Sequence, residues 1–172
     1  MAQEYSQFSP ESENDASLNN SHSCDTGSRG NWSIVLPGMP DALPQVRALV
    51  TQAAERCGFG SDEIAKIEMA VDEACTNIIE HAYHVFPEHG PPEQLEIEVH
   101  ACEYPDRLEI TIRDHSMLDF PVDEHAPTGI DNYFTEHKRR GLGLFIIRSF
   151  VDDVKHRFVD GRGNELLLVK YF

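Results

Sequence analysis

Apolar residues recur along this chain with two spacings, and each spacing predicts one kind of element. A period of about 3.6 residues predicts helices, and it spans residues 41–57, 61–86 and 141–151. Alternation of apolar and polar residues predicts strands, and it spans residues 32–36, 94–102, 107–113, 154–159 and 166–172. This order of elements predicts a two-layer α/β sandwich, with a mixed, mostly antiparallel sheet and helices on one face.

The second predicted helix carries the most informative polar residues. Ser61 is a candidate N-cap, and Asp62 and Glu63 in the first turn face the positive end of the helix dipole. Glu73 and Asn77 lie four residues apart, on the side of the helix opposite its apolar arc. Such a pair offers a proton acceptor beside an oxygen ligand for a hard metal ion. Alone, such a pair is more often part of a solvated helix face.

Length, composition and charge narrow the classes of function. The 172 residues suit one domain. Residues 1–29 are rich in Ser, Asn and Glu, which predicts a disordered polar tail before a single domain at 30–172. The net charge of -16 disfavours direct binding to nucleic acid or to an anionic membrane. No apolar run approaches the roughly 20 residues of a membrane span.

The cysteines give no sign of a metal or redox motif. Cys24, Cys57, Cys75 and Cys102 form no C-x-x-C pair, and Cys75 falls within a helical pattern as a small core residue. We therefore expect reduced thiols in a cytoplasmic protein.

Asp114 and a glycine-rich helix start flank a long polar loop. Asp114 ends a predicted strand, and a loop without periodicity follows over about 115–140. Loops this long in a compact domain are usually functional or disordered. Gly141 and Gly143 then open a helix, where glycines and free backbone amides can approach a phosphate closely. Positive charge directly precedes that helix in Lys138, Arg139 and Arg140.

Taken in order, these features resemble a known family. The run Asp72-Glu73-Ala74-Cys75-Thr76-Asn77, then Asp114, then Gly141-Leu142-Gly143-Leu144, resembles the N, G1 and G2 boxes of the GHKL (Bergerat-fold) ATPases. Together with His81-Ala82-Tyr83, the first and last runs are most similar to the bacterial anti-sigma-factor serine/threonine kinases. The resemblance covers about 31–172 and implies the Bergerat fold.

The resemblance also implies a role for each residue. Glu73 would be the general base or orienting acceptor for the attacking hydroxyl, and Asn77 would bind Mg²⁺ that bridges the ATP phosphates. Asp114 would accept a hydrogen bond from the adenine amino group, and the loop at about 115–140 would be an ATP lid. The phosphates would be met by the residues at the end of the lid and the start of the helix: Lys138, Arg139, Arg140, Gly141, Leu142, Gly143 and Leu144.

The implied function is that of an ATP-dependent protein serine/threonine kinase and anti-sigma factor in a partner-switching system. Its substrate would be a Ser or Thr on a STAS-domain anti-anti-sigma partner. It would also bind a sigma factor, and a homodimer is compatible with the family.

Two positions differ from the family pattern and motivate an alternative. Ser116 stands where the first glycine box usually has Gly, and Asn164 follows Gly163 where the family usually has Thr. The alternative is a non-catalytic or weakly nucleotide-binding module of the same fold that sequesters partners. The catalytic domain of a sensor histidine kinase is disfavoured, because the short polar N-terminal segment has no helical hairpin that could carry a phosphoacceptor His.

Overall fold

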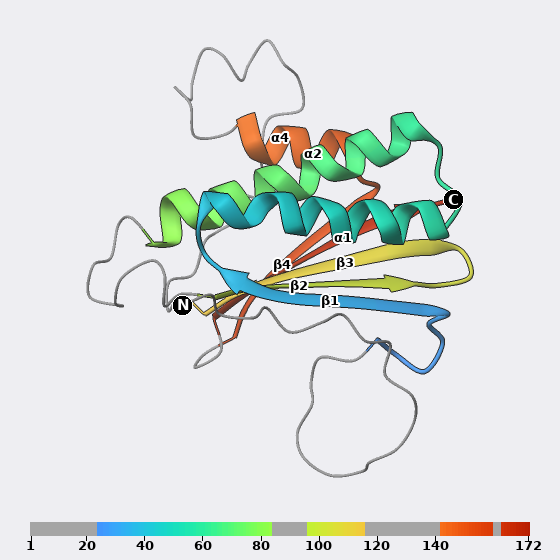
Figure 1. The fold of residues 1–172 in the computed structure, drawn as a ribbon, viewed down its shortest axis with the longest axis horizontal. Coiled ribbons are helices and arrows are strands. Elements are labelled where there is room, and N and C mark those ends of the chain that lie inside the picture. The colour runs from blue at the N-terminus through green and yellow to red at the C-terminus, as the bar shows by residue number, and fades with distance from the viewer. Residues whose placement is uncertain (1–23, 84–95, 116–141, 160–162) are drawn as a thin grey trace, which may run out of the picture.

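One antiparallel sheet forms the floor of the molecule (Figure 1). The computed structural model describes residues 24–83, 96–115, 142–159 and 163–172. Within this part of the chain five strands pair in the order β1-β2-β3-β5-β4, and all four pairings are antiparallel rather than mostly so. The strands are β1 (Gly30–Pro37), β2 (Glu96–Glu103), β3 (Arg107–Asp114), β4 (Asp153–Val159) and β5 (Gly163–Tyr171).

The described helices cover one face of this sheet, which confirms the predicted two-layer sandwich (Figure 1). In chain order they are η1 (Pro40–Ala42), α1 (Leu43–Arg56), α2 (Ser61–Asn77), η2 (Ile78–Tyr83) and α4 (Leu142–Phe150). The termini of these elements agree with the predictions to within a few residues, which is the usual uncertainty of helix ends. None of the described helices is long and apolar enough to cross a membrane.

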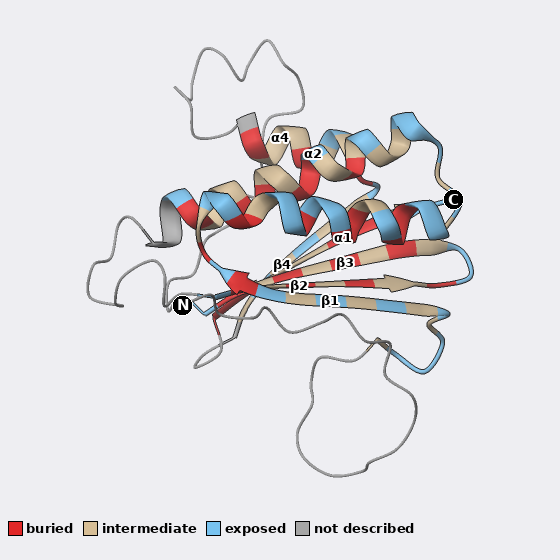
Figure 2. Ribbon diagram, viewed as in Figure 1, coloured by how far each residue is buried: buried red, intermediate tan, exposed pale blue. Residues whose placement is uncertain are grey.

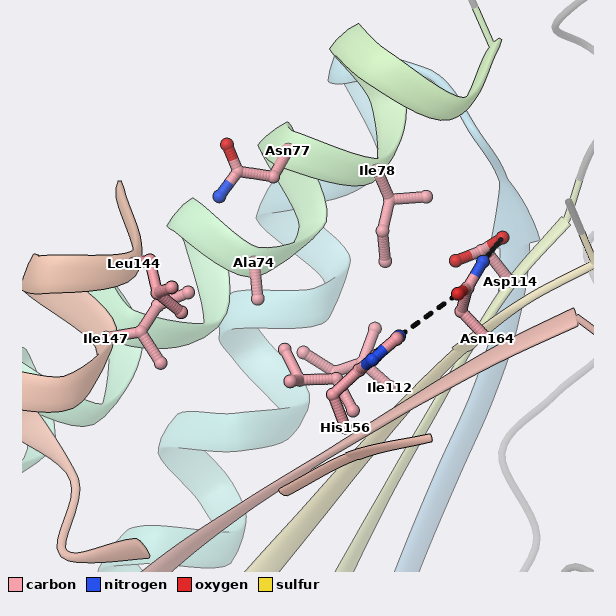
Figure 3. A pocket seen from close by; sticks show the side chains of 10 residues that line it. Ala74, Asn77, Ile78, Ile112, Asp114, Leu144, Ile147, His156 and Asn164 are labelled. Atoms are coloured by element: carbon pink, nitrogen blue, oxygen red, sulfur yellow. Dashed lines mark hydrogen bonds between the residues drawn. The ribbon is translucent and has the colours of Figure 1, made fainter. Parts of the chain in front are cut away.

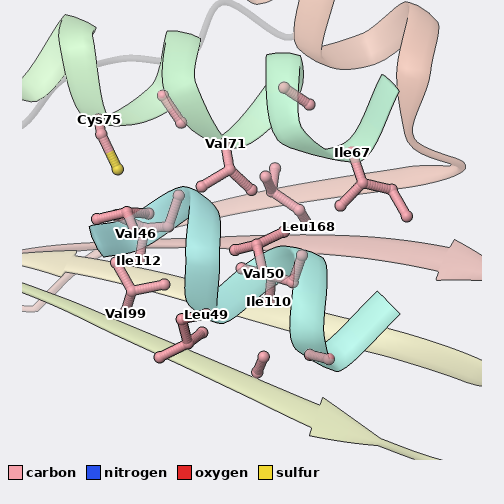
Figure 4. Packing of buried hydrophobic residues seen from close by; sticks show 14 of the residues in the cluster. Val46, Leu49, Val50, Ile67, Val71, Cys75, Val99, Ile110, Ile112 and Leu168 are labelled. Atoms are coloured by element: carbon pink, nitrogen blue, oxygen red, sulfur yellow. The ribbon is translucent and has the colours of Figure 1, made fainter. Parts of the chain in front are cut away.

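The core lies between the helices and the sheet because each element turns its apolar side inward (Figures 2 and 4). In α1, Val50 and Ala53 are fully buried, and Ile67 of α2 is too. Strand β3 alternates strictly, and its buried positions are Leu108, Ile110, Ile112 and Asp114. The last of these matters for function: the alternation places a carboxylate on the face where hydrophobic side chains pack.

Helix α2 changes its winding directly after Asn77. Its N-cap residue is Gly60, one position before the predicted Ser61. Asp62 and Glu63 lie in the first turn, as predicted. From Ile78 to Tyr83 the chain continues as a π-helix, η2. Wider turns of this kind frequently mark functional positions in helices.

The expectation of four reduced thiols is wrong for one pair. Cys24 and Cys102 form a disulfide with Cα atoms 5.8 Å apart, whereas Cys57 and Cys75 are free. The backbone N–H of Arg29 also donates to the carbonyl of Glu103 at 2.7 Å. Residues 24–29 therefore lie against the end of β2, although composition had assigned them to the tail. The pairing is a long-range contact, which cysteine spacing does not reveal.

Several predicted features fall outside the described residues. They are the rest of the polar tail (1–23), the connection after η2 (84–95) and the predicted lid from Ser116 onward, including Lys138, Arg139, Arg140 and Gly141.

Truncation of Ile110 tests the predicted core. Ile110 is 2% exposed on the central strand β3. Ile110→Ala is expected to lower the free energy of unfolding by about 2–4 kcal/mol through lost burial and the cavity left behind. Val35 is 51% exposed on the opposite face of the sheet, and Val35→Ala is expected to change stability by no more than about 0.5 kcal/mol. Urea titration of both variants measures the difference, and equal losses would contradict this assignment of the two faces.

Candidate functional site

A pocket opens between α2, α4 and the ends of the central strands (Figure 3). Helix α2 contributes one wall, α4 contributes the second, and the strands β3, β4 and β5 form the floor. The lining residues are Ala74, Asn77, Ile78, Ile112, Asp114, Leu144, Ile147, His156, Asn164 and Leu166. Apolar side chains dominate this lining, so the few polar groups determine what can bind.

Those polar groups include two buried side chains. Within the described residues, Asp114 (1% exposed) and Asn164 (6% exposed) are the buried polar or charged residues of the core, and both lie in this pocket. They face each other across the β3–β5 pairing. Burial of a carboxylate is unfavourable unless hydrogen bonds compensate for its lost hydration.

Hydrogen bonds join three of the lining residues into a chain. Asn164 Nδ2 donates to Asp114 Oδ1 at 3.3 Å, and Asn164 Oδ1 lies 3.0 Å from His156 Nε2. Figure 3 shows His156, Asn164 and Asp114 side by side on the floor of the pocket. The position that departs from the family pattern, Asn164, thus supports Asp114 directly.

Gly163 allows β5 to begin against Asp114. Its φ is +91°, in the left-handed region that favours glycine. A Cβ at this position would collide with the carbonyl oxygen of Asp114 and would lie 2.8 Å from the Cα of His115. Residue 163 must therefore be glycine, because its backbone has a positive φ and because a side chain would collide with Asp114.

At the other end of the pocket, Asn77 lies next to Glu73 and Gly143, which meet just outside the pocket lining. A Cβ on Gly143 would collide with Glu73 Oε1 and would lie 2.8 Å from Asn77 Nδ2. The Glu73–Asn77 face of α2 therefore meets the first turn of α4 instead of open solvent. Because Asn77 lines the same pocket as Asp114, the two ends belong to one site.

The surroundings of Glu73 make its carboxyl group a better proton acceptor. Burial is the main cause that raises its pKa, and the charges of Glu80 and Asp72 raise the pKa further. Asp72 is itself paired with Arg47 at 2.5 Å, which directs that neighbour toward α1.

The structure brings together the predicted site residues that it describes. Asn77, Asp114 and Leu144 line the pocket, and Glu73 and Gly143 meet beside Asn77. Leu142 is the first residue of α4. The predicted phosphate contacts at 138–141 lie outside the described residues, so their roles stay predictions.

Sequence reasoning missed the apolar walls and one polar residue. Most of the walls had a usable signal. Ala74 and Ile147 lie one helical turn from Asn77 and Gly143, and Ile112 lies two strand positions before Asp114. Ile78 directly follows Asn77. His156 had no such signal. It reaches Asn164 from the neighbouring strand β4, and strand pairing of this kind cannot be deduced from spacing along the chain.

The residues present fit a magnesium–nucleotide complex. An apolar slot that ends in a buried carboxylate suits a flat base with an exocyclic amino group. Gly143, at the start of α4, lets the first turn of that helix approach Glu73 and Asn77 closely, and backbone amides at a helix start can bind a phosphate. No cluster of three or more His, Cys, Asp or Glu suited to a metal occurs among the described residues. Mg²⁺ does not need one, since it commonly binds through one protein oxygen plus phosphate oxygens and water.

Comparison with known families decides the classification. Residues 36–170 match the histidine kinase-like ATPase domain. The chain belongs to this family. Its relatives include the serine-protein kinase RsbW of Bacillus cereus (strain AH187), 30% identical over 139 residues, which cover 79% of this chain and 81% of the relative. RsbW of Bacillus mycoides (strain KBAB4) is 29% identical, with the same coverage.

A solved structure agrees with this classification at the level of the fold. The RsbU and RsbW domains of Rv1364c from Mycobacterium tuberculosis match 82% of this chain with a TM-score of 0.52 and 16% identity. This chain spans about a third of that longer protein, 31% of its length. The family predicted from the N, G1 and G2 boxes, and its serine-protein kinase branch, are thereby confirmed.

Substitution of Gly143 tests the contact between α2 and α4. Gly143→Ala is expected to displace Glu73 and Asn77 and to lower the rate of ATP-dependent phosphoryl transfer by about tenfold to a hundredfold, because small displacements of reacting groups are costly. Gly60→Ala is the matched control, since a Cβ there meets open space. Full activity of Gly143→Ala would show that the contact does not position the reacting groups.

Proposed function

We propose that this protein is an ATP-dependent protein serine/threonine kinase and anti-sigma factor of a partner-switching system. Its substrate is a Ser or Thr hydroxyl on a STAS-domain anti-anti-sigma protein, and its other partner is a sigma factor. The observation that carries the proposal is one pocket with two chemical ends: Asp114 at the base end, and Asn77 beside Glu73 and Gly143 at the other.

At the base end, Asp114 accepts a hydrogen bond from the exocyclic amino group of adenine. Its acceptor geometry is fixed in part by Asn164, which donates to Oδ1. Ile112 and Ile147 supply apolar surface for the faces of the ring. Adenine is preferred over bases with an oxo group at the same position, because two acceptors facing each other in a buried site are unfavourable.

At the phosphate end, Gly143 and Asn77 hold the charged part of the nucleotide. Backbone amides at the start of a helix such as α4 can bind anions, and the absence of a side chain on Gly143 brings this helix start close to Glu73 and Asn77. The side-chain oxygen of Asn77 would be the protein ligand for Mg²⁺. The bound ion would neutralise negative charge on the phosphates, and Lys138, Arg139 and Arg140 would add positive charge by resemblance to the family.

Glu73 takes the proton that phosphoryl transfer releases. The hydroxyl oxygen of the partner's Ser or Thr forms a bond to the γ-phosphorus, and the bond from that phosphorus to the β–γ bridging oxygen breaks, so ADP leaves with the electron pair. The hydroxyl proton passes to the Glu73 carboxylate. The raised pKa of Glu73 favours this acceptance.

The proposal also covers the partners of the protein and its cellular location. The names of the RsbW relatives describe serine-protein kinases, and the net charge of -16 favours protein partners over direct DNA contact. We include a homodimer and a cytoplasmic location in the proposal. In that compartment the Cys24–Cys102 disulfide requires a specific oxidation step, since cytosolic thiols are normally kept reduced.

The non-catalytic alternative loses part of its motivation in the structure. It rested on Ser116 and Asn164. Asn164 donates a hydrogen bond to Asp114, as a supporting residue should, and Ser116 lies outside the described residues. Glu73, which a module that only sequesters partners does not need, lies beside Asn77 and Gly143.

Replacement of Glu73 tests the catalytic proposal. With Mg-ATP and a STAS-domain partner from the same genome, Glu73→Gln is expected to lower the rate of partner phosphorylation by about 10²- to 10⁴-fold. Glu80→Gln is the matched control, because it removes an exposed carboxylate of the same helical stretch. It should retain activity and move the acid limb of the pH–rate profile to lower pH, since the charge of Glu80 helps to raise the pKa of Glu73.

Stability measurements separate loss of chemistry from loss of fold. A carboxyl group whose pKa is raised on folding contributes stability below its ordinary pKa, and this contribution is lost as pH rises through the raised value. Glu73→Gln should therefore leave the free energy of unfolding at neutral pH unchanged or higher. Undiminished phosphorylation by Glu73→Gln, or no phosphorylation of any STAS-domain partner by the wild type, would refute the kinase proposal.

A further inference from the structure

We propose that His156 is a positioning residue that fixes the side-chain amide of Asn164 and so makes the pocket selective for a 6-amino purine over a 6-oxo purine. The inference deepens the proposed function, and it rests on the proposed role of Asp114 as the acceptor for the base. It assigns to His156 a role that no sequence motif indicated.

The geometry places three side chains in line across three strands. His156 on β4 lies 3.0 Å from Asn164 Oδ1 on β5, and Asn164 Nδ2 lies 3.3 Å from Asp114 Oδ1 on β3. All three side chains line the same pocket. Asn164 and Asp114 are buried and His156 is half-buried, so water competes little for these hydrogen bonds.

The chemistry of the three side chains determines which group donates and which accepts in each of these hydrogen bonds. An ionised carboxylate accepts hydrogen bonds and cannot donate them, so the NH₂ of Asn164 must face Asp114. The carbonyl oxygen of the same amide then faces His156, so Nε2 of His156 must carry a hydrogen. Both the Nε2–H tautomer of neutral histidine and the imidazolium ion meet this requirement.

Without a donor on His156, the amide of Asn164 would lose one of the two contacts that set its orientation. The amide could then turn away from Asp114, and the carboxylate would lose a hydrogen bond that stabilises its charge. A buried carboxylate without that donor takes up a proton more readily, and its O–H can then point toward the base. Such a group binds a 6-oxo base as readily as a 6-amino base, so selectivity falls even where overall affinity survives.

The experiment compares two nucleotides that differ at this one position of the base. Mg-ATP and Mg-ITP, which carries a 6-oxo group, are titrated calorimetrically into the full-length wild type, His156→Phe and His156→Gln. The wild type should prefer ATP, and His156→Phe, which keeps a ring without a donor, should reduce the ratio of the two affinities by about tenfold. His156→Gln, which restores an N–H donor, should recover most of the ratio.

His100→Gln is the matched control. His100 lies on β2 opposite Ser33 of β1 and Thr111 of β3, on the face of the sheet away from the helices. Its replacement should leave the ratio of ATP to ITP affinity unchanged.

The outcomes distinguish this inference from the function on which it rests. Equal weakening of both nucleotides by His156→Phe, with the ratio kept, would show that His156 only fills space and would overturn the inference alone. A wild type that binds neither nucleotide, or that binds both equally, would overturn the proposed role of Asp114 as well.

A second measurement on the wild type does not depend on any variant folding. Long-range ¹H–¹⁵N correlation spectra of the histidine rings should show that Nε2 of His156 is protonated. An Nδ1–H tautomer at His156 would contradict the inference, because its unprotonated Nε2 could not donate to Asn164.

Discussion

The burial of the Asp114 carboxylate is the constraint on which the rest of the site depends. Strand alternation puts it on the same side of β3 as Leu108, Ile110 and Ile112, and only 1% of it is exposed. A charge in such a place is tolerated only where neighbours supply hydrogen bonds. The start of β5 is arranged to provide one: Gly163 adopts a positive φ against Asp114, and Asn164 donates to the carboxylate.

At the opposite end of the pocket, the surroundings of the Glu73 carboxylate destabilise its charge instead of stabilising it. Partial burial is the main cause that raises the pKa of Glu73, and the charges of two nearby carboxylates, Glu80 and Asp72, raise it further. The close approach of Gly143 holds this group beside Asn77 in spite of that repulsion. Stability is thereby lowered at the position where proton transfer needs a stronger base, a compromise typical of reaction sites. The two ends come from separate elements, and packing of α2 and α4 on the sheet fixes the distance between them.

Much of this could be predicted from the sequence, because hydrophobic periodicity reports burial directly. The apolar arc of α2 and the alternation in β3 identified both elements, and the order of Glu73, Asn77, Asp114 and Gly143 identified the family. Contacts between distant segments were beyond the same reasoning. The Cys24–Cys102 disulfide depends on how residues 24–29 fold back against β2. The link from His156 to Asn164 depends on the pairing of β4 with β5. Local spacing contains neither piece of information.

Calorimetric titration of Mg-ATP into Asp114→Asn, combined with its free energy of unfolding, tests the central claim most directly. The account predicts that the affinity for ATP falls by at least about tenfold, because the uncharged amide is a weaker acceptor for the base. It also predicts that stability is unchanged or higher, because a buried charge has been removed. Wild-type affinity in Asp114→Asn would contradict the claim that this buried carboxylate recognises the nucleotide.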